Sequence, residues 1–465
     1  MEKWRSRAAF LLASIGSAVG LGNVWRFPYV CYKSGGGAFL IPYIIAIFVV
    51  GIPLLIAEFA IGSIYRKSSP MALKRISKKS EFAGWLSVIV AFFISIYYCV
   101  IVGWSLCYIF HSIFMAWGQD ASSFFYYKFL SNVGQILFSI LFVWVAIYLI
   151  LYKGVESIGK FSLIAIPFPI ILLLILTFVG FSLPNSIKGL EFYLSPDFSK
   201  LLLPSTWLSA FAQVFFSLSL AQGIMIAYGS YLEKKSDISN NSFITAFADS
   251  GIAFLGGFAV FSTLGYLSFA TGMQFEEIAK GGFALAFITY PTVISKIPFL
   301  QAVFGIIFFS ILFLFGLTSA YSMIEAISKS ISEKFKISRG KSNFLICSIG
   351  FISGLIFIKN IFLIETADYF ISDFALVACG LLECIIFAHL MGEEKLRKYI
   401  NKVSEIKVGN WFGISLKFLA PAVLLLMLLA SSTNLFNYPI AGFFIISLIF
   451  LISLILWRIK CQRAQ

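Results

Sequence analysis

The sequence predicts an all-α polytopic membrane protein, and two features of the chain carry that prediction. Of its 465 residues, 60% are hydrophobic, 18% are aromatic and only 12% are charged. A soluble domain of this size cannot bury so much apolar surface, whereas a bilayer accommodates it. Apolar stretches long enough to cross a membrane also recur along the whole chain, and the first of them is interrupted in its middle.

About twelve apolar segments have the length of a transmembrane helix, which needs roughly 20 residues. They lie at 8–32, 36–63, 83–117, 134–152, 158–181, 207–232, 243–273, 300–331, 341–358, 364–391, 412–431 and 438–458. We therefore expect one membrane domain over residues 1–458. Residues 459–465 then form a short cytoplasmic tail.

Basic residues are concentrated in alternate loops between these spans. They are Arg66, Lys67, Lys74, Arg75, Lys78 and Lys79, then Lys334, Lys336, Arg339 and Lys341, then Lys395, Arg397, Lys398, Lys402 and Lys407. The loops of the other set hold few, such as Lys128. This asymmetry follows the positive-inside rule and places both termini in the cytoplasm. The net charge of +14 thus reflects membrane topology, and membrane lipid rather than nucleic acid is the expected partner.

The first span is broken at its centre by Gly16, Gly20, Gly22 and Asn23. Irregular backbone at membrane depth is tolerated only where it is buried in protein or lines a cavity. A glycine-interrupted span is therefore the best sequence pointer to the binding site of a transporter. Taken alone, the Gly16 and Gly20 pair also fits a helix face that packs closely on another helix.

A second break lies in the sixth span, where Ser217, Ser219, Gln222 and Gly223 interrupt an apolar helix. Breaks in spans one and six indicate two five-span halves related by inverted topology, at about 8–181 and 207–391. The two spans over 412–458 fall outside this repeat. Substrate and ions are expected at the middle of the membrane, between the two breaks.

Several motifs in order carry a family resemblance. They are the runs Gly16–Tyr29, Gly35–Tyr43 and Gly51–Glu58, the FFSLSL run of span six, and Gly316–Ser319. Together they resemble the neurotransmitter:sodium symporters over spans one to ten. The resemblance implies the fold of the bacterial leucine transporter, in which spans one and six are unwound. It also implies solute uptake driven by Na⁺, with access alternating around a central site.

The resemblance implies where the carboxylate and the ammonium of a substrate bind. Free N–H groups at a half-helix N-terminus suit a carboxylate, and the family pattern assigns this role to Leu21, Gly22 and the Tyr98 hydroxyl. The ammonium is assigned to carbonyls of the two breaks and to the Ser219 hydroxyl. The expected substrate-binding residues are Ser17, Ala18, Gly20, Leu21, Gly22, Ile94, Tyr98, Phe216, Ser217, Ser219, Gln222, Ala320 and Met323.

Gly20 indicates the substrate class. Family members that carry amines without a carboxylate have an aspartate at this position, whereas glycine leaves room for the substrate's own carboxylate. Ile94 and Met323 favour a hydrophobic or aromatic side chain. The expected substrate is therefore a neutral amino acid, although which one stays open.

Sodium is a hard cation that needs several oxygen ligands, and the resemblance implies two Na⁺ sites with no organic cofactor. The first is formed by Ala18, Asn23, Ser217 and Asp249, and the second by Gly16, Val19, Phe315, Thr318 and Ser319. Taken alone, the hydroxyls of Thr318 and Ser319 would more often hydrogen-bond to a carbonyl of their own helix than to an ion.

Asp249 is a charged residue inside a span, which is costly and points to a functional role. Some family members have asparagine here, and chloride-dependent members hold a halide with a serine one turn further on. This chain has Ala253 at that turn. We therefore expect the Asp249 carboxylate to supply the negative charge, and transport to be independent of chloride.

Gate residues are also implied by the resemblance. Arg26 and Asp368 match an outer ion pair, with Gln213 beside them and Phe216 as an aromatic lid. Trp4, Tyr231 and Glu333 match the cytoplasmic gate. The family's basic residue three positions before the tryptophan falls on Met1, so Lys3, Arg5 or the amino terminus are left as substitutes.

The function predicted from the sequence is sodium-coupled symport of neutral amino acids across a prokaryotic plasma membrane. No acids, metal ligands or nucleophile and base converge as in an enzyme. No continuous polar lining suggests a channel, although a channel stays a weak alternative. A sodium-coupled transporter of another small carboxylate-bearing or amine solute is the second alternative. The oligomeric state stays open.

Overall fold

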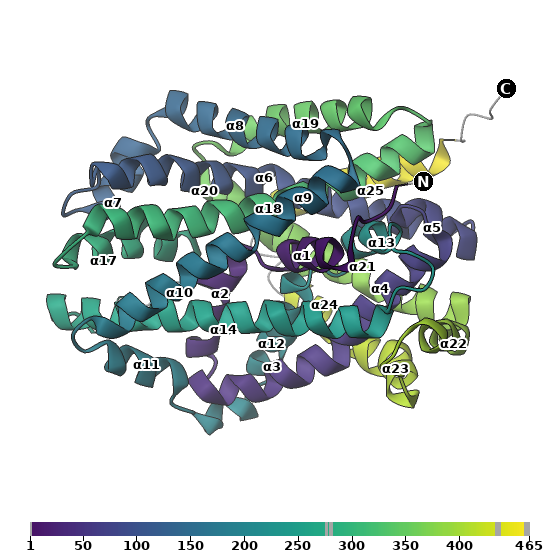
Figure 1. Cartoon of the computed structure of the whole chain (residues 1–465), viewed down its shortest axis with the longest axis horizontal. Helices are drawn as coiled ribbons and strands as arrows, with labels where there is room; N and C mark the ends of the chain where they lie inside the picture. Colours follow the sequence, from purple (N-terminus) through teal and green to yellow (C-terminus); the bar gives the residue numbers. More distant parts are fainter. Residues whose placement is uncertain (1, 275–277, 279–281, 433–438, 460–465) are drawn as a thin grey trace.

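The structure of the protein is a computed structural model that describes residues 2–274, 278, 282–432 and 439–459 (Figure 1). Within these ranges the chain is helical apart from short connections, and no strand occurs. The long helices run roughly along the same direction, and the described part of the chain begins and ends towards the same end of the molecule. The predicted all-α fold class is therefore confirmed.

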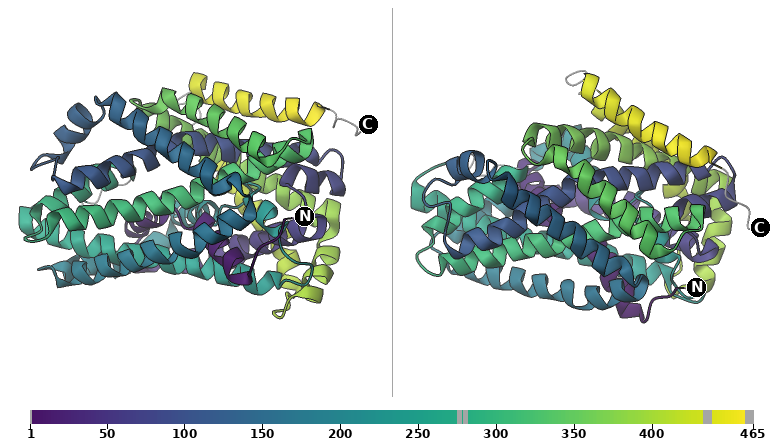
Figure 2. Two further views of the ribbon diagram at one scale, coloured as in Figure 1. Left: turned by 45° about the horizontal axis from the view of Figure 1, so that its top comes forward. Right: turned by 90° about the horizontal axis from the view of Figure 1, so that it is seen from above.

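Nine helices among the described residues are long and apolar enough to cross a membrane, and a bent helix pair adds a tenth crossing. The nine are Gly36–Tyr65 (η1, α3, η2 and α4), α6 (Glu81–Ile113), α8 (Val133–Tyr152), Val155–Ser182 (α9 and α10), α14 (Ile238–Thr271), α18 (Gln301–Phe335), Arg339–Phe357 (α19 and η6), Ile361–Val403 (α20 to α22) and Asn410–Ser432 (α23, η9 and α24). The bent pair is α1 (Arg7–Ala18) and α2 (Leu21–Lys33), at 52° to each other. The pair α12 (Pro204–Ser217) and α13 (Ile224–Gly229) and the peripheral α25 (Pro439–Arg458, yellow in Figure 2) occupy the remaining two predicted spans.

Short helices also form between the spans, where the sequence showed no apolar segment. They are α5 (Ser69–Ile76), α7 (Ala121–Ser123), η3 (Phe124–Phe129), α11 (Ser186–Leu194), η4 (Phe198–Leu202), α16 (Gly282–Ala284), η5 (Leu285–Thr289) and α17 (Tyr290–Lys296). Packing on the long helices holds them in place. The Tyr290 ring of α17, for example, stacks on Phe308 of α18 with centroids 3.8 Å apart.

The first predicted break is present between α1 and α2. The Gly20 N–H donates to the Asn23 side-chain oxygen at 2.9 Å, so Asn23 satisfies backbone that the helix leaves unpaired. A Cβ atom at Gly20 would lie 2.9 Å from the hydroxyl oxygens of Ser319 and Tyr98. Only glycine fits here without displacing those two side chains.

The second predicted break separates α12 from α13. Ser219, Ala221 and Gly223 have φ angles of 52°, 57° and 70°, in the left-handed region that non-glycine residues rarely adopt. The Ala221 N–H donates to the buried Glu58 carboxylate at 2.9 Å. Glu58 therefore supports the unwound backbone.

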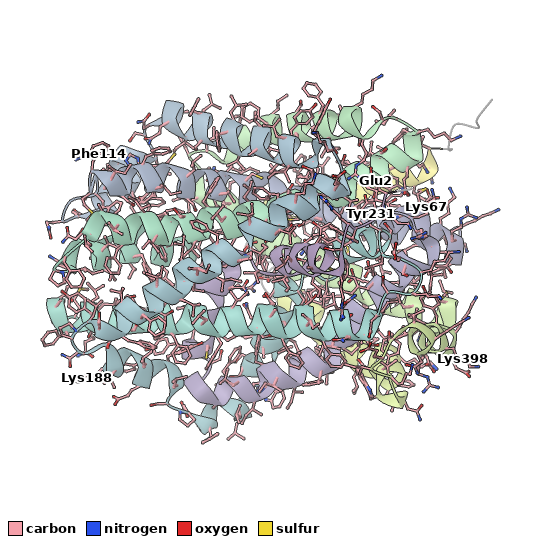
Figure 3. All side chains as sticks on the ribbon, viewed as in Figure 1. Glu2, Lys67, Phe114, Lys188, Tyr231 and Lys398 are labelled. Atoms are coloured by element: carbon pink, nitrogen blue, oxygen red, sulfur yellow. The ribbon has the colours of Figure 1, made fainter. Side chains whose placement is uncertain are left out.

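We name the two ends of the molecule by their position. The N-terminal face holds Glu2, Lys67 and Lys398, and the opposite face holds Phe114 and Lys188 (Figure 3). Between them α18 packs along α6 through the centre, and α1 packs against α14 and α18. The division of the chain into inverted halves and a single domain stays a prediction.

Candidate functional site

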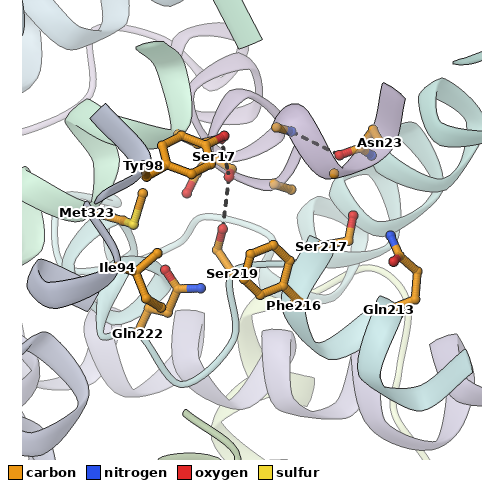
Figure 4. Close-up of a pocket in the computed structure, with 14 residues that line it drawn as sticks. Ser17, Asn23, Ile94, Tyr98, Gln213, Phe216, Ser217, Ser219, Gln222 and Met323 are labelled. Carbon is orange, nitrogen blue, oxygen red and sulfur yellow. Dashed lines mark hydrogen bonds between the residues drawn. The ribbon is translucent and has the colours of Figure 1, made fainter. Parts of the chain in front are cut away.

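The two helix breaks meet at a small central cavity of about 30 Å³ (Figure 4), enough for a few water molecules. The Ser219 hydroxyl of the second break donates to the Ser17 carbonyl of the first at 2.8 Å. The cavity is lined by Ser17, Ala18, Gly20, Gly22, Asn23, Ile94, Tyr98, Gln213, Phe216, Ser217, Ser219, Gln222, Ser319 and Met323.

All predicted substrate-binding residues except two line this cavity. Leu21 lines a larger cavity on the side of the opposite face, and its N–H donates to the Tyr98 hydroxyl at 3.1 Å. Ala320 is fully buried in α18 and does not line the cavity. The N-terminus of α2 and the Tyr98 hydroxyl thus lie together at the cavity wall.

Three polar side chains converge beside the cavity, and we call Asn23, Ser217 and Asp249 the Asp249 cluster. The Asn23 amide donates to Asp249 Oδ1 at 2.7 Å, and the Ser217 hydroxyl donates to Oδ2 at 2.7 Å. Asp249 is 1% exposed. A buried carboxylate flanked by a hydroxyl and an amide fits the oxygen ligands that a hard cation requires.

A second group of oxygens lies where α18 passes the first break, and we call Val19, Thr318 and Ser319 the Ser319 cluster. The Ser319 hydroxyl donates toward the Val19 and Ser17 carbonyls at 3.2 and 3.3 Å. Thr318 instead donates to the Phe315 carbonyl of its own helix at 2.9 Å. A Cβ atom built on Gly16 would lie 3.4 Å from the Thr318 Cβ, so the two backbones pass close together. The carbonyls and hydroxyls here are neutral, as in many Na⁺ cages.

The larger cavity, of about 570 Å³, lies between the central cavity and the opposite face. Gly22, Tyr98 and Phe216 line both cavities and therefore lie between them. The Arg26 guanidinium lies 5.1 Å from the centre of the Phe216 ring. It also approaches Asp373 at 3.7 Å, with both side chains partly exposed.

The predicted pairing of Arg26 with Asp368 is wrong in this conformation. Asp368 accepts hydrogen bonds from the hydroxyls of Tyr97 at 2.7 Å and Ser372 at 3.0 Å. Asp368 is the last residue of α20 (Ile361–Asp368), and a π-helical turn, η7 (Tyr369–Ala375), follows it. A π-helix bonds residues five apart, which aligns Asp373 with Asp368. A sequence read with the α-helical period misses this alignment.

Trp4 and Tyr231 lie together at the N-terminal face, as predicted. The Trp4 indole donates to the Tyr228 carbonyl at 3.0 Å, and its ring meets the Tyr231 ring edge-on at 6.0 Å. The Tyr231 hydroxyl donates to the buried Glu325 at 2.5 Å and accepts from Arg339 at 2.9 Å. Arg339 also forms ion pairs with Glu325 and Glu2.

Among the described residues, Glu333 forms no hydrogen bond with Tyr231, Glu325 or Arg339, and its gate role stays a prediction. It accepts hydrogen bonds from the N–H and the hydroxyl of Ser68, at 3.0 and 2.9 Å, at the start of α5. Met1 lies outside the described residues, and Lys3 pairs with Glu233 at 3.2 Å on the surface. Arg339 is the basic residue that approaches Tyr231.

Sequence reasoning missed Asp373, Glu325 and Arg339. Glu325 had a signal, because an acidic residue inside an apolar span is a functional hypothesis by default. Arg339 was counted as a loop charge, since its position beside Tyr231 depends on how α19 folds back on α18. No local pattern predicts that packing.

The sequence of this chain matches a known protein family. The family model described as the sodium:neurotransmitter symporter family matches residues 1–133 and 128–461. An uncharacterised sodium-dependent transporter of Methanocaldococcus jannaschii is 41% identical over 99% of this chain and 98% of its own length. The sodium-dependent dopamine transporter of Caenorhabditis elegans is 30% identical over 94% of this chain and 81% of its own length.

A solved structure is similar throughout. The crystal structure of MhsT in complex with L-phenylalanine has a TM-score of 0.81 and 30% identity, and covers 93% of this chain and all of the MhsT chain. The fold that the family resemblance implies, that of the bacterial leucine transporter, is thereby confirmed. The family consists of transporters rather than enzymes. This chain belongs to the sodium:neurotransmitter symporter family and is a multi-pass, sodium-dependent membrane transporter.

Proposed function

We propose that this chain is a Na⁺-coupled symporter of neutral amino acids with hydrophobic or aromatic side chains. The observation that carries the proposal is the wall of the central cavity beside Gly20. The N-terminus of α2 and the Tyr98 hydroxyl meet there, and no acidic side chain occupies the position. N–H groups at a helix N-terminus favour a carboxylate.

The opposite wall suits the other parts of such a substrate. The Ser219 hydroxyl and the Ser17 carbonyl are already hydrogen-bonded to each other, and they can be shared with an ammonium group. Ile94, Met323 and Phe216 provide an apolar surface, and Gln222 adds one polar contact. The small volume requires these side chains to move before a large amino acid fits. The MhsT complex with L-phenylalanine supports an amino acid of this kind.

Na⁺ is the coupling ion in this proposal, with two ions per cycle. The Asp249 cluster and Ala18 form the first site, which the substrate carboxylate completes. The Ser319 cluster, with the carbonyls of Gly16 and Phe315, forms the second. The fixed charge of Asp249 makes chloride unnecessary, because it supplies the negative charge that a bound halide supplies in chloride-dependent family members.

The conformation fits one stage of alternating access. We propose that the N-terminal face is cytoplasmic, in agreement with the basic loops, and that the protein resides in a prokaryotic plasma membrane. The cavity of about 570 Å³ then leads outward, closed below by Phe216 and flanked by Arg26 and Asp373. The network around Tyr231 closes the cytoplasmic side.

The proposal is tested by uptake into proteoliposomes with an imposed inward Na⁺ gradient. Labelled leucine, phenylalanine and tryptophan are compared with dopamine, tyramine and phenethylamine as competitors. The proposal expects at least one neutral amino acid to accumulate, and the amines to compete only weakly. Amines that compete as well as amino acids would refute the substrate class.

A further inference from the structure

Lys329 is a buried lysine that none of the roles above uses. It lies in the membrane-spanning helix α18, one turn from Glu325 and one turn from Glu333, and its side chain is 7% exposed. Its ammonium contacts the ring of Tyr231, which is labelled in Figure 3. A lysine is almost never so deeply buried unless it is paired.

The Lys329 ammonium contacts the end of the half-helix α13. It donates to the Ser230 hydroxyl and lies 3.6 Å from the centre of the Tyr231 ring. Both residues directly follow Gly229, the last residue of α13. The ammonium therefore lies at the negative end of the α13 dipole.

These contacts replace only part of the hydration of the ammonium. An ammonium has three N–H donors, and Ser230 accepts from one of them while donating its own proton to the Ala227 carbonyl. The two acidic neighbours on α18 attract the ammonium electrostatically, but their carboxylates hydrogen-bond to other groups. Glu325 binds Arg339 and Tyr231, and Glu333 binds Ser68. A buried charge without a direct ion pair keeps a desolvation penalty that water would remove.

Lys334 is a natural comparison on the same helix. It is 1% exposed, but its ammonium forms a direct ion pair with Glu81 at 2.7 Å. Its partner Glu81 lies at the start of α6, a long helix without a break. Lys329 instead faces α13, which the second break separates from α12. Lys329 therefore contacts a short half-helix, whereas Lys334 is paired with a residue of a long unbroken helix.

We propose that Lys329 favours opening of the N-terminal face. In the closed conformation its ammonium is incompletely solvated, and separation of α13 from α18 admits water to it. The lysine thus offsets the stabilisation that Trp4, Arg339 and Glu325 give the closed gate around Tyr231. The inference rests on alternating access in the proposed function, but not on the identity of the substrate.

The test is hydrogen–deuterium exchange of the purified full-length protein in nanodiscs, with Na⁺ and without amino acid. The reporter amides are those of Trp4, Ser230 and Tyr231, which bond within the closed gate. In Lys329→Met the buried charge is gone and the apolar stem remains. We expect exchange at these amides to slow by about tenfold, which corresponds to about 1.4 kcal/mol. Substrate uptake should slow while the apparent affinity for substrate is kept.

Two variants control for packing and for loss of charge in general. Lys329→Arg keeps the charge and should exchange like the unmodified protein. Lys334→Met removes a paired charge, and should lower thermal stability without slowing exchange at the reporter amides. Unchanged exchange in Lys329→Met would overturn the proposal, because Lys329 would then have no effect on opening. Faster exchange would also overturn it, because Lys329 would then stabilise the closed conformation. Equal slowing in Lys329→Arg would overturn it as well. The measurement needs no substrate. Its result therefore stands even if the proposed amino-acid substrate is wrong.

Discussion

The Asp249 cluster and the Ser319 cluster lie on either side of the same break in span one, yet they are built differently. The first contains a full negative charge, held by Asn23 and Ser217 at 2.7 Å each. The second contains only neutral carbonyl and hydroxyl oxygens around Ser319. In the proposed function, the first adjoins the substrate and the second joins α1 to α18.

This difference predicts that the two clusters are unequally sensitive to substitution. Losing a charge beside a cation in a low-dielectric site removes a large Coulomb energy. Losing one neutral oxygen among several removes about as much as one hydrogen bond, on the order of 1 kcal/mol. The charged cluster should therefore be essential for uptake, and the neutral cluster should only adjust the Na⁺ affinity.

Replacing Asp249 by asparagine is expected to have the largest effect. It removes the one charge of the Asp249 cluster, at a cost of several kcal/mol, so Na⁺-driven uptake should fall by more than about a hundredfold. The measurement is initial uptake into proteoliposomes at saturating Na⁺. As a control, adding Ala253→Ser should restore part of the uptake only when chloride is present. Normal uptake by Asp249→Asn in gluconate would show that the charge is not needed.

Tyr98→Phe tests whether the substrate carboxylate binds next to the Asp249 cluster. The variant removes the hydroxyl that contacts the Leu21 N–H, and the buried ring keeps its packing. The concentration of amino acid for half-maximal uptake should rise by about tenfold, as expected for one hydrogen bond to a charged group. The Na⁺ dependence measured at saturating substrate should change little. An equal loss in Na⁺ affinity would place the hydroxyl in the ion site instead.

Thr318→Val tests the neutral cluster with a nearly isosteric change. Removing one hydroxyl should raise the Na⁺ concentration for half-maximal uptake by about fivefold, equivalent to about 1 kcal/mol. Ser330→Ala is a matched control, because its buried hydroxyl also bonds to a carbonyl of α18, that of Ala326. The control should leave the Na⁺ dependence unchanged. If Thr318→Val also leaves it unchanged, the Thr318 hydroxyl bonds only to its own helix.

The smallest effect is expected at the outer pair. Arg26 and Asp373 are partly exposed and 3.7 Å apart, and such pairs contribute about 0–1 kcal/mol. Asp373→Asn should change the rate of uptake by no more than about fivefold. Asp368→Asn leaves the Arg26 contact intact and replaces the carboxylate that accepts from Tyr97 with a neutral amide. A substituted-cysteine probe in the outer cavity should therefore become more accessible in the first variant than in the second.

The sequence predicted the two helix breaks because their signals are local, whereas the individual site residues were implied by the family resemblance. Glycines, an asparagine and hydroxyls inside apolar spans fix where the helices break, and Ser17, Ser219 and Asn23 do meet at the cavity. The span boundaries likewise follow from runs of apolar residues. Both kinds of signal lie within one segment and need no tertiary information.

The gates were predicted less well because they depend on tertiary contacts. Asp373 approaches Arg26 because of a π-helical turn, and no residue type in the sequence predicts that turn. Arg339 reaches Tyr231 only because α19 packs back against α18. Glu333 was assigned to the gate by its position in the family pattern. Its carboxylate accepts hydrogen bonds from Ser68 at the start of α5. The partners of Arg26, Tyr231 and Glu333 across helices were therefore outside the reach of the sequence.

The most direct test of the account measures uptake of a labelled neutral amino acid by the unmodified protein in proteoliposomes, with an inward Na⁺ gradient in gluconate and then in chloride. Coupling through the Asp249 carboxylate predicts accumulation in both media at similar rates, and none when choline replaces Na⁺. Strict dependence on chloride, or accumulation without Na⁺, would contradict the account.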